Sequence, residues 1–179
     1  MAEKGMINPT YIDYVMLGII QQKPVSGYGI LKALKELSPG NFSSSPGTIY
    51  PALKRLQRFG LVKESVSGKA SKKLFQLSSR GQVFLIAWLL DPISVDDVRR
   101  RKEELLLRFT FMDELVSQNE KKHFLASFQQ QSKNYLQKVQ ARLKANAELL
   151  SQHQKMTLEH EISSYKSTIK WSQRALRDI

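Results

Sequence analysis

The order in which the hydrophobic period changes along the chain limits its fold more than any other feature. Between residues 10 and 60, apolar side chains recur in three successive runs at the spacing of an amphipathic helix. Residues 61–66 and 73–77 then predict two short strands, separated by a polar tip that contains a glycine. Helical spacing returns from about Ser79. The order helix, helix, helix, strand, strand, helix predicts a winged helix-turn-helix domain over residues 1–91.

Capping signals predict where the first three helices begin. Thr10 and Asp13 have the spacing of a capping box, and Ser26 supplies a side-chain oxygen for the start of a second helix. Ser45-Pro46 combines an N-cap hydroxyl with a proline at the first helical position. Gly60 is the expected end of the third helix.

Residues 92–179 are predicted to form a second, helical domain for dimerisation and effector sensing. Ser94 with Asp97 and Ser117 with Glu120 are two further capping boxes. The first is expected to open a single helix that carries apolar residues as far as Val116. The second is expected to open a long helix that reaches Leu150. The fold class is therefore mainly α with a small two-stranded β-wing.

The last segment of the chain carries a heptad-like stripe, with apolar residues alternately four and three positions apart. A lone amphipathic helix cannot bury such a stripe, so the helices of this half must pack on each other or on a second copy. We expect dimer contacts from Leu158, Ile162, Tyr165, Ile169 and Leu176.

Positive charge is concentrated in one segment. The chain has a formal net charge of +12, which favours polyanionic partners. Residues 41–80 hold eight basic side chains against one acid, whereas residues 92–179 hold sixteen against eleven. The charge therefore favours a nucleic-acid surface on the first domain.

The third predicted helix has one face suited to reading a DNA groove. If Ile49, Leu53 and Leu56 face the core, helical geometry places Gly47, Pro51, Lys54 and Arg58 on the opposite side, flanked by Thr48, Tyr50 and Arg55. The small residues Ser43, Ser44, Ser45 and Gly47 allow a close approach, with hydroxyl and N–H groups for phosphates or base edges. Lys54 is the best-placed long donor, and Lys69, Lys72 and Lys73 of the wing suit phosphate or minor-groove contact.

Basic residues on a helix often form only a solvated face, so the prediction of DNA binding rests on their combination with the winged-helix order. Two alternatives stay open. A protein-interaction adaptor would have little affinity for any duplex beyond bulk electrostatics. A DNA-packaging protein would bind all sequences equally, whereas a groove-reading helix favours its own site by about a thousandfold or more.

No enzymatic chemistry is expected from this sequence. It contains no cysteine, and its three histidines show no metal-ligand spacing and no triad arrangement. Phosphate-binding glycine loops, cofactor motifs, apolar runs of membrane-spanning length and a signal peptide are not found in it. We therefore expect a cytoplasmic protein without metal or cofactor.

Aromatic residues are the candidates for an effector site. Phe84, Trp88 and Phe109 could line an apolar pocket between the winged helix and the helical domain. Core and dimer packing is the commoner role of such residues, so both interpretations stay open.

Four stretches of the sequence resemble the PadR family of bacterial transcriptional regulators. They are 16–20 (MLGII), 24–30 (PVSGYGI), 47–56 (GTIYPALKRL) continuing into 60–62 (GLV), and 77–81 (LSSRG). Tyr-Pro inside a recognition helix makes the third stretch the most specific. Further on, 103–109 (EELLLRF) and Lys170-Trp171 resemble the branch with a long C-terminal domain similar to that of virulence activators.

The resemblance implies a homodimer in which each winged helix reads half of a palindromic operator on double-stranded DNA. It implies that Tyr28, the segment from Ser45 to Lys54 and the wing lysines touch DNA. It also implies transcriptional control, more often repression than activation, which a small aromatic effector could release.

Overall fold

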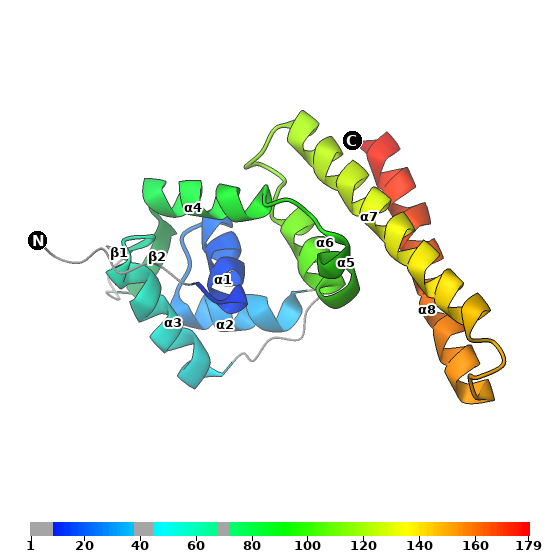
Figure 1. Cartoon of the computed structure of the whole chain (residues 1–179). Coiled ribbons are helices and arrows are strands. Elements are labelled where there is room, and N and C mark those ends of the chain that lie inside the picture. The colour runs from blue at the N-terminus through cyan, green and yellow to red at the C-terminus, as the bar shows by residue number, and fades with distance from the viewer. Residues whose placement is uncertain (1–8, 38–44, 68–71) are drawn as a thin grey trace, which may run out of the picture. The chain divides into compact units, whose positions relative to one another are not determined.

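The computed structural model describes residues 9–37, 45–67 and 72–179. The chain divides into two compact units, Met1–Leu89 and Leu90–Ile179 (Figure 1). The first unit contains, in order, α1 (Tyr11–Gln22), α2 (Gly27–Glu36), α3 (Pro46–Arg58), β1 (Val62–Ser67), β2 (Lys72–Leu77) and α4 (Ser79–Leu89). This order confirms the winged helix-turn-helix fold expected from the sequence.

Helix α1 is the centre of the first unit. Every residue from Val15 to Ile20 is buried, so this helix is surrounded by other elements rather than lying on the surface. Its first turn is closed by the predicted capping box, in which the Thr10 N–H donates to the Asp13 carboxylate at 2.8 Å. Helix α2 begins as predicted, with the Ser26 hydroxyl accepting from the N–H of Gly29.

The wing is an antiparallel pair of strands that is bonded to its surroundings at its base. Strand β2 also pairs with Val25, which precedes the N-cap of α2, because Val25 and Phe75 exchange both backbone hydrogen bonds. At the other side, the Ser78 hydroxyl lies 2.7 Å from the carbonyl of Gly60 and 3.0 Å from that of Leu61. A Cβ on Gly81 would lie 2.0 Å from the same Leu61 oxygen, so only glycine allows α4 to pack this closely. The base of the wing is thus fixed to both α2 and α4.

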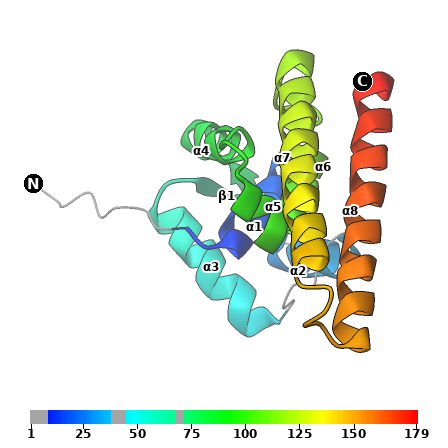
Figure 2. The ribbon, with the colours of Figure 1, turned by 45° about the vertical axis from the view of Figure 1, so that its right-hand side comes forward.

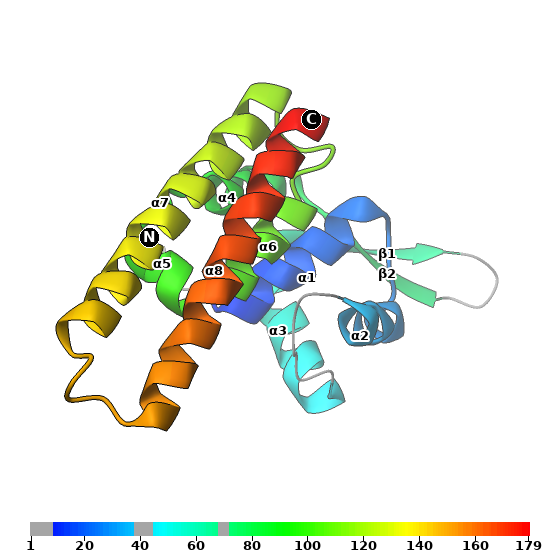
Figure 3. The same ribbon diagram turned by 90° about the vertical axis from the view of Figure 1, so that its right-hand side faces the viewer.

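The second unit contains α5 (Val95–Arg100), α6 (Lys102–Thr110), α7 (Gln118–Ala145) and α8 (Gln152–Asp178). Helices α7 and α8 run antiparallel and side by side, as Figures 2 and 3 both show. Leu158, Tyr165 and Ser172, seven residues apart, are the buried positions of α8. The stripe of α8 therefore packs largely within its own chain.

The prediction of one helix from Ser94 to Val116 is wrong, because the chain leaves the helical conformation at Arg101, with φ −132° and ψ 31°. Both short helices are bonded to α8: the Tyr165 hydroxyl donates to the carbonyl of Val98, and the Lys102 ammonium donates to the Ser164 hydroxyl. These tertiary contacts hold the bend. Because only one residue separates the two helices, the spacing of the apolar residues does not reveal the break.

The long helix also ends earlier than predicted. Helix α7 stops at Ala145, so Leu150 lies in the connection to α8. The start of α8 is marked by a capping box between Ser151 and Gln154, a signal that the sequence carried and our prediction did not use. Among the described residues, no helix is long and apolar enough to cross a membrane.

Candidate nucleic-acid interface

Helix α3 is sharply divided into a buried and an exposed side. Ile49, Ala52, Leu53 and Leu56 are at most 1% exposed and hold the helix against the rest of the unit. At its start the Ser45 hydroxyl accepts from the N–H of Thr48, as the sequence predicts for an N-cap. The helix is therefore firmly seated, and its other side is available for binding.

The exposed side of α3 carries the residues that the sequence predicted to face DNA. Ser45, Gly47, Tyr50, Pro51 and Lys54 are all exposed, and Thr48 is half-buried. Over Gly47 the space is open, since the nearest atom to a built Cβ is the Ser45 hydroxyl at 3.9 Å. Within residues 9–37, 45–67 and 72–179 Lys54 has no ion pair, so its ammonium is available to a ligand.

The first turn of α2 lies against Tyr50 of α3. Gly27 makes this possible: a Cβ at this position would lie 2.8 Å from the Tyr50 ring, so the ring rests directly on the backbone of α2. Tyr28, the next residue, is 74% exposed. The structure thus brings the first turn of α2 together with the exposed side of α3.

Arg55 has a role that the sequence analysis missed. We expected it to flank the DNA-reading face, but its guanidinium binds both oxygens of Asp13 in α1, at 3.2 and 2.5 Å. Asp13 is 1% exposed and Arg55 is about one-third exposed. This two-point ion pair fixes the position of α3 relative to α1. No signal in the sequence links two residues so far apart.

One of the wing lysines expected to contact DNA is paired within the protein. The Lys73 ammonium lies 2.8 Å from the Glu64 carboxylate on the facing strand. This hydrogen bond, with a second from Gln57, lowers the pKa of Glu64. The wing cation Lys73 is therefore partly neutralised by Glu64.

Four predicted contacts cannot be placed fully. Ser43, Ser44 and Lys69 lie outside the described residues, and for Lys72 the structure describes only the backbone at the start of β2. Their roles on DNA stay predictions.

The candidate effector residues lie in two separate aromatic groups. Phe84 and Trp88 stack on Tyr14 within the first unit, with ring centroids 5.4 and 4.7 Å away. Phe109 packs on Phe124 and Trp171 within the second unit. Both groups show the packing role that we had considered the commoner one, and effector binding by these residues stays a prediction.

The candidate dimer residues differ in how much surface they retain. Leu158 and Tyr165 are buried inside the second unit, whereas Ile162, Ile169 and Leu176 are half-buried. Of these five candidates, only the latter three keep surface for contact with a second copy. A metal site is not formed by any cluster of His, Asp or Glu among the described residues.

Comparison with known proteins divides the chain in a similar way. Residues 16–87 match the transcriptional regulator PadR-like family, and residues 101–179 match the C-terminal domain family named virulence activator alpha.

Individual relatives are regulators too. The chain is 28% identical over 159 residues to the negative transcriptional regulator PadR of Bacillus subtilis, covering 87% of this chain and 80% of that protein. It is 37% identical over 73 residues to the transcriptional regulator YqjI of Escherichia coli, which covers 40% of this chain and 34% of that one. The crystal structure of B. subtilis PadR with operator DNA superposes with a TM-score of 0.44 at 23% identity, covering 94% of this chain and 98% of that one.

Proposed function

We propose that this chain, whose residues 16–87 match the PadR-like family of transcriptional regulators, is a DNA-binding regulator that acts as a homodimeric repressor of a palindromic operator. The observation that carries the proposal is the division of α3 into a fully buried side and an exposed side, on which Lys54 has no ion pair with any described residue. A helix seated in this way presents a rigid set of side chains to a major groove.

In the proposed complex the exposed side of α3 reads bases. Thr48, Tyr50 and Lys54 reach base edges, with the lysine donating to the acceptors of a guanine. Gly47 and Pro51 project little from this side of α3, so the helix backbone can come close to the bases of the groove. Tyr28 adds a contact from the start of α2, beside Tyr50.

Phosphate contacts supply the sequence-independent part of the affinity. Ser43, Ser44 and Ser45 precede the start of α3, where the N–H of Gly47 and the positive end of the helix favour an anion. Lys69, Lys72 and Lys73 of the wing are assigned to the neighbouring phosphates. Each such contact makes the affinity fall with increasing salt.

Two copies are needed to read a palindrome. We assign the dimer contact to the α8 stripe, chiefly to Ile162, Ile169 and Leu176, which keep apolar surface after α8 has packed on α7. A small aromatic effector would act by favouring a dimer geometry in which the two copies of α3 no longer fit successive major grooves.

Selection of bound sequences from random DNA, followed by gel-shift titration, tests the reading role of α3. Thr48→Ala and Lys54→Ala should each weaken binding to the selected site by about 1–3 kcal/mol, because each removes a base contact. Lys32→Ala in α2 is the control: it removes the same charge from an exposed lysine that pairs with Glu36 of its own helix. Equal losses for Lys32→Ala and Lys54→Ala would mean that bulk charge, and not α3, determines binding.

Light scattering tests the dimer. The full chain should have twice the mass of one 20.5 kDa copy. Ile162→Glu with Ile169→Glu should shift it towards the monomer, whereas Lys166→Glu on the exposed side of α8 should not. A dimer that survives the first pair of changes would place the interface elsewhere.

A promoter-reporter assay tests the sign of regulation. The relative named a negative regulator supports repression, so expression from a promoter that contains the selected site should rise when the protein is absent. A fall in expression would identify an activator.

A further inference from the structure

Helix α3 contains a proline at a position where a helical N–H is normally bonded. Pro46 occupies the first position of the helix, where a missing N–H costs nothing, but Pro51 lies well past the first turn. The chain nevertheless stays helical from Pro46 to Arg58 (Figure 2). The residue at position 51 should donate to the carbonyl of Gly47, and proline has no hydrogen to donate. The Gly47 carbonyl therefore lacks the donor that a carbonyl in the first turn of a helix normally has.

Gly47 is not required by the conformation or the packing of α3. Its φ lies outside the positive range in which glycine is favoured, and a Cβ would meet its nearest neighbour, the Ser45 hydroxyl, at 3.9 Å. A side chain would therefore fit against the described part of the chain, and alanine would stabilise the helix. The effect of glycine is to leave the backbone uncovered on the exposed side of α3.

Gly47 and Pro51 thus weaken α3 at two exposed positions about one turn apart. Glycine and proline are the two residues least favourable in a helix interior. The helix is otherwise well supported, with an N-cap at Ser45 and a buried side that is at most 1% exposed. The local rules of helix formation are broken mainly where a surface has another function. The role of this pair therefore lies in what α3 binds.

A carbonyl without its helical donor selects its partner in a DNA major groove. The base groups that donate there are the amino groups of adenine and cytosine, whereas guanine and thymine present acceptor oxygens, which a carbonyl repels. Lys54, on the same side of α3, has the opposite chemistry and donates. The helix between Gly47 and Lys54 spans about 10 Å, or roughly three base steps, so both groups fall within one half-site.

We propose that the Gly47 carbonyl, which Pro51 leaves without its helical donor, accepts a hydrogen bond from the amino group of an adenine or cytosine in the operator. The inference rests on the proposed function, since it requires α3 to lie in a major groove. Pro51 is then a positioning residue that acts through the Gly47 carbonyl, and the missing side chain of Gly47 keeps this carbonyl accessible. Helix α3 thus presents an acceptor near its start and a donor, Lys54, about two turns later.

Pro51→Ala tests the inference, because alanine supplies the missing N–H. In selection from random DNA, this variant should lose the preference for one base pair of each half-site, and its gel-shift affinity for the original site should fall by about tenfold or more. Its thermal unfolding midpoint should rise above that of the unaltered chain, since α3 gains a hydrogen bond and loses a proline. A variant that is more stable and less specific separates a lost base contact from damage to the fold.

An ester analogue of the full chain, with lactic acid at position 51, controls for loss of the proline ring. Lactic acid has the methyl side chain of alanine but no N–H, so the Gly47 carbonyl stays without its helical donor. This analogue should keep the base preference of the unaltered chain although it lacks the ring. An analogue as unselective as Pro51→Ala would assign the effect to contacts of the ring and refute the proposal.

Base analogues identify the partner of the carbonyl. At the base pair in question, purine replaces adenine or 2-pyrimidinone replaces cytosine, so that the base loses its amino group. This replacement should weaken binding of the unaltered chain by about tenfold and leave binding of Pro51→Ala unchanged. Equal losses in the two chains, or a base preference that Pro51→Ala retains, would overturn the proposal. A chain that selects no sequence from random DNA would instead refute the proposed function, and this inference with it.

Discussion

Removing the ion pair between Asp13 and Arg55 should reveal how firmly the recognition helix is held. Arg55→Ala leaves a carboxylate that is 1% exposed without its countercharge. Removal of one partner of a buried pair costs about 3–5 kcal/mol. Two hydrogen bonds from Thr10 remain, and Arg55 is one-third exposed, so we expect the lower end, about 3 kcal/mol of unfolding free energy.

Removing the carboxylate partner of this ion pair should reduce the unfolding free energy by less than removing Arg55. Asp13→Ala removes the same ion pair and the capping box of α1, which is worth about 1 kcal/mol, but the freed guanidinium can turn to water. We expect a loss of about 2 kcal/mol for this variant. The double variant should lose no more than Arg55→Ala alone, which gives a coupling energy of about 2 kcal/mol.

Urea unfolding followed by far-ultraviolet circular dichroism measures the unfolding free energy of the unaltered chain, the two single variants and the double variant. Lys54→Ala is the control. It removes an exposed side chain next to Arg55 in the sequence, and the unfolding free energy should change by no more than about 0.5 kcal/mol. A coupling energy below about 0.5 kcal/mol would refute the reasoning, because the two side chains would then contribute independently. Arg55→Lys should restore the charge but not the two-point geometry, and should recover only part of the stability.

Three further results are expected. Gly27→Ala should change the unfolding free energy by less than about 1 kcal/mol, yet weaken gel-shift binding to the selected DNA, because the new methyl group displaces Tyr50; unchanged binding would remove Tyr50 from the interface. Glu64→Gln should strengthen DNA binding by about twofold to fivefold at low salt by freeing Lys73, an increase that should disappear at high salt. Burial raises the pKa of Tyr165 to about 12 from 10.0. The contribution of this shift to stability is therefore complete below pH 10 and is lost as the pH rises towards 12. Unfolding free energies measured across this pH range should fall in the unaltered chain and fall less in Tyr165→Phe.

The first unit could be predicted from sequence because its signals are local. The N-caps at Thr10, Ser26 and Ser45 and the turn at Gly60, where φ is +68°, each depend on residues within one turn of the chain. The division of α3 into two sides follows from helical spacing alone.

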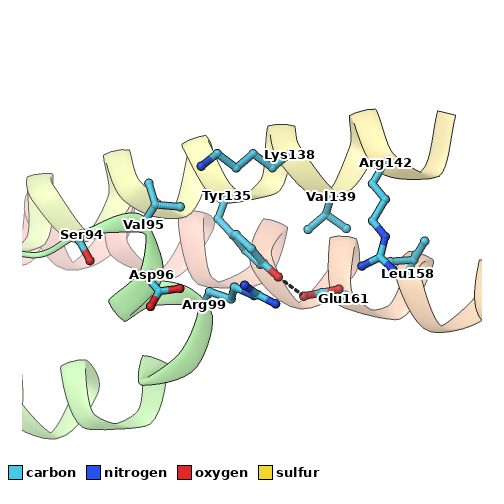
Figure 4. Close-up of a pocket in the computed structure, with 10 residues that line it drawn as sticks. All are labelled: Ser94, Val95, Asp96, Arg99, Tyr135, Lys138, Val139, Arg142, Leu158 and Glu161. Atoms are coloured by element: carbon cyan, nitrogen blue, oxygen red, sulfur yellow. Dashed lines mark hydrogen bonds between the residues drawn. The ribbon is translucent and has the colours of Figure 1, made fainter. Parts of the chain in front are cut away.

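The parts that the sequence did not reveal depend on distant partners. The role of Arg55 is set by Asp13, 42 residues away, and the bend at Arg101 is accompanied by bonds from α5 and α6 to α8. A cavity of about 430 Å³ lined by α5, α7 and α8 (Figure 4) likewise exists only once the three helices have packed. A hydrophobic period states which side of a helix is buried but not what covers it.

The attachment of the wing at its base limits how this protein can be regulated. Ser78 holds the strand ends, and the N–H of Leu61 donates to the carbonyl of Leu56 in the last turn of α3, so the base of the wing is fixed to this helix. If both contact DNA as proposed, a signal that released one of them would also displace the other. We therefore expect control of binding to move the first unit as a whole.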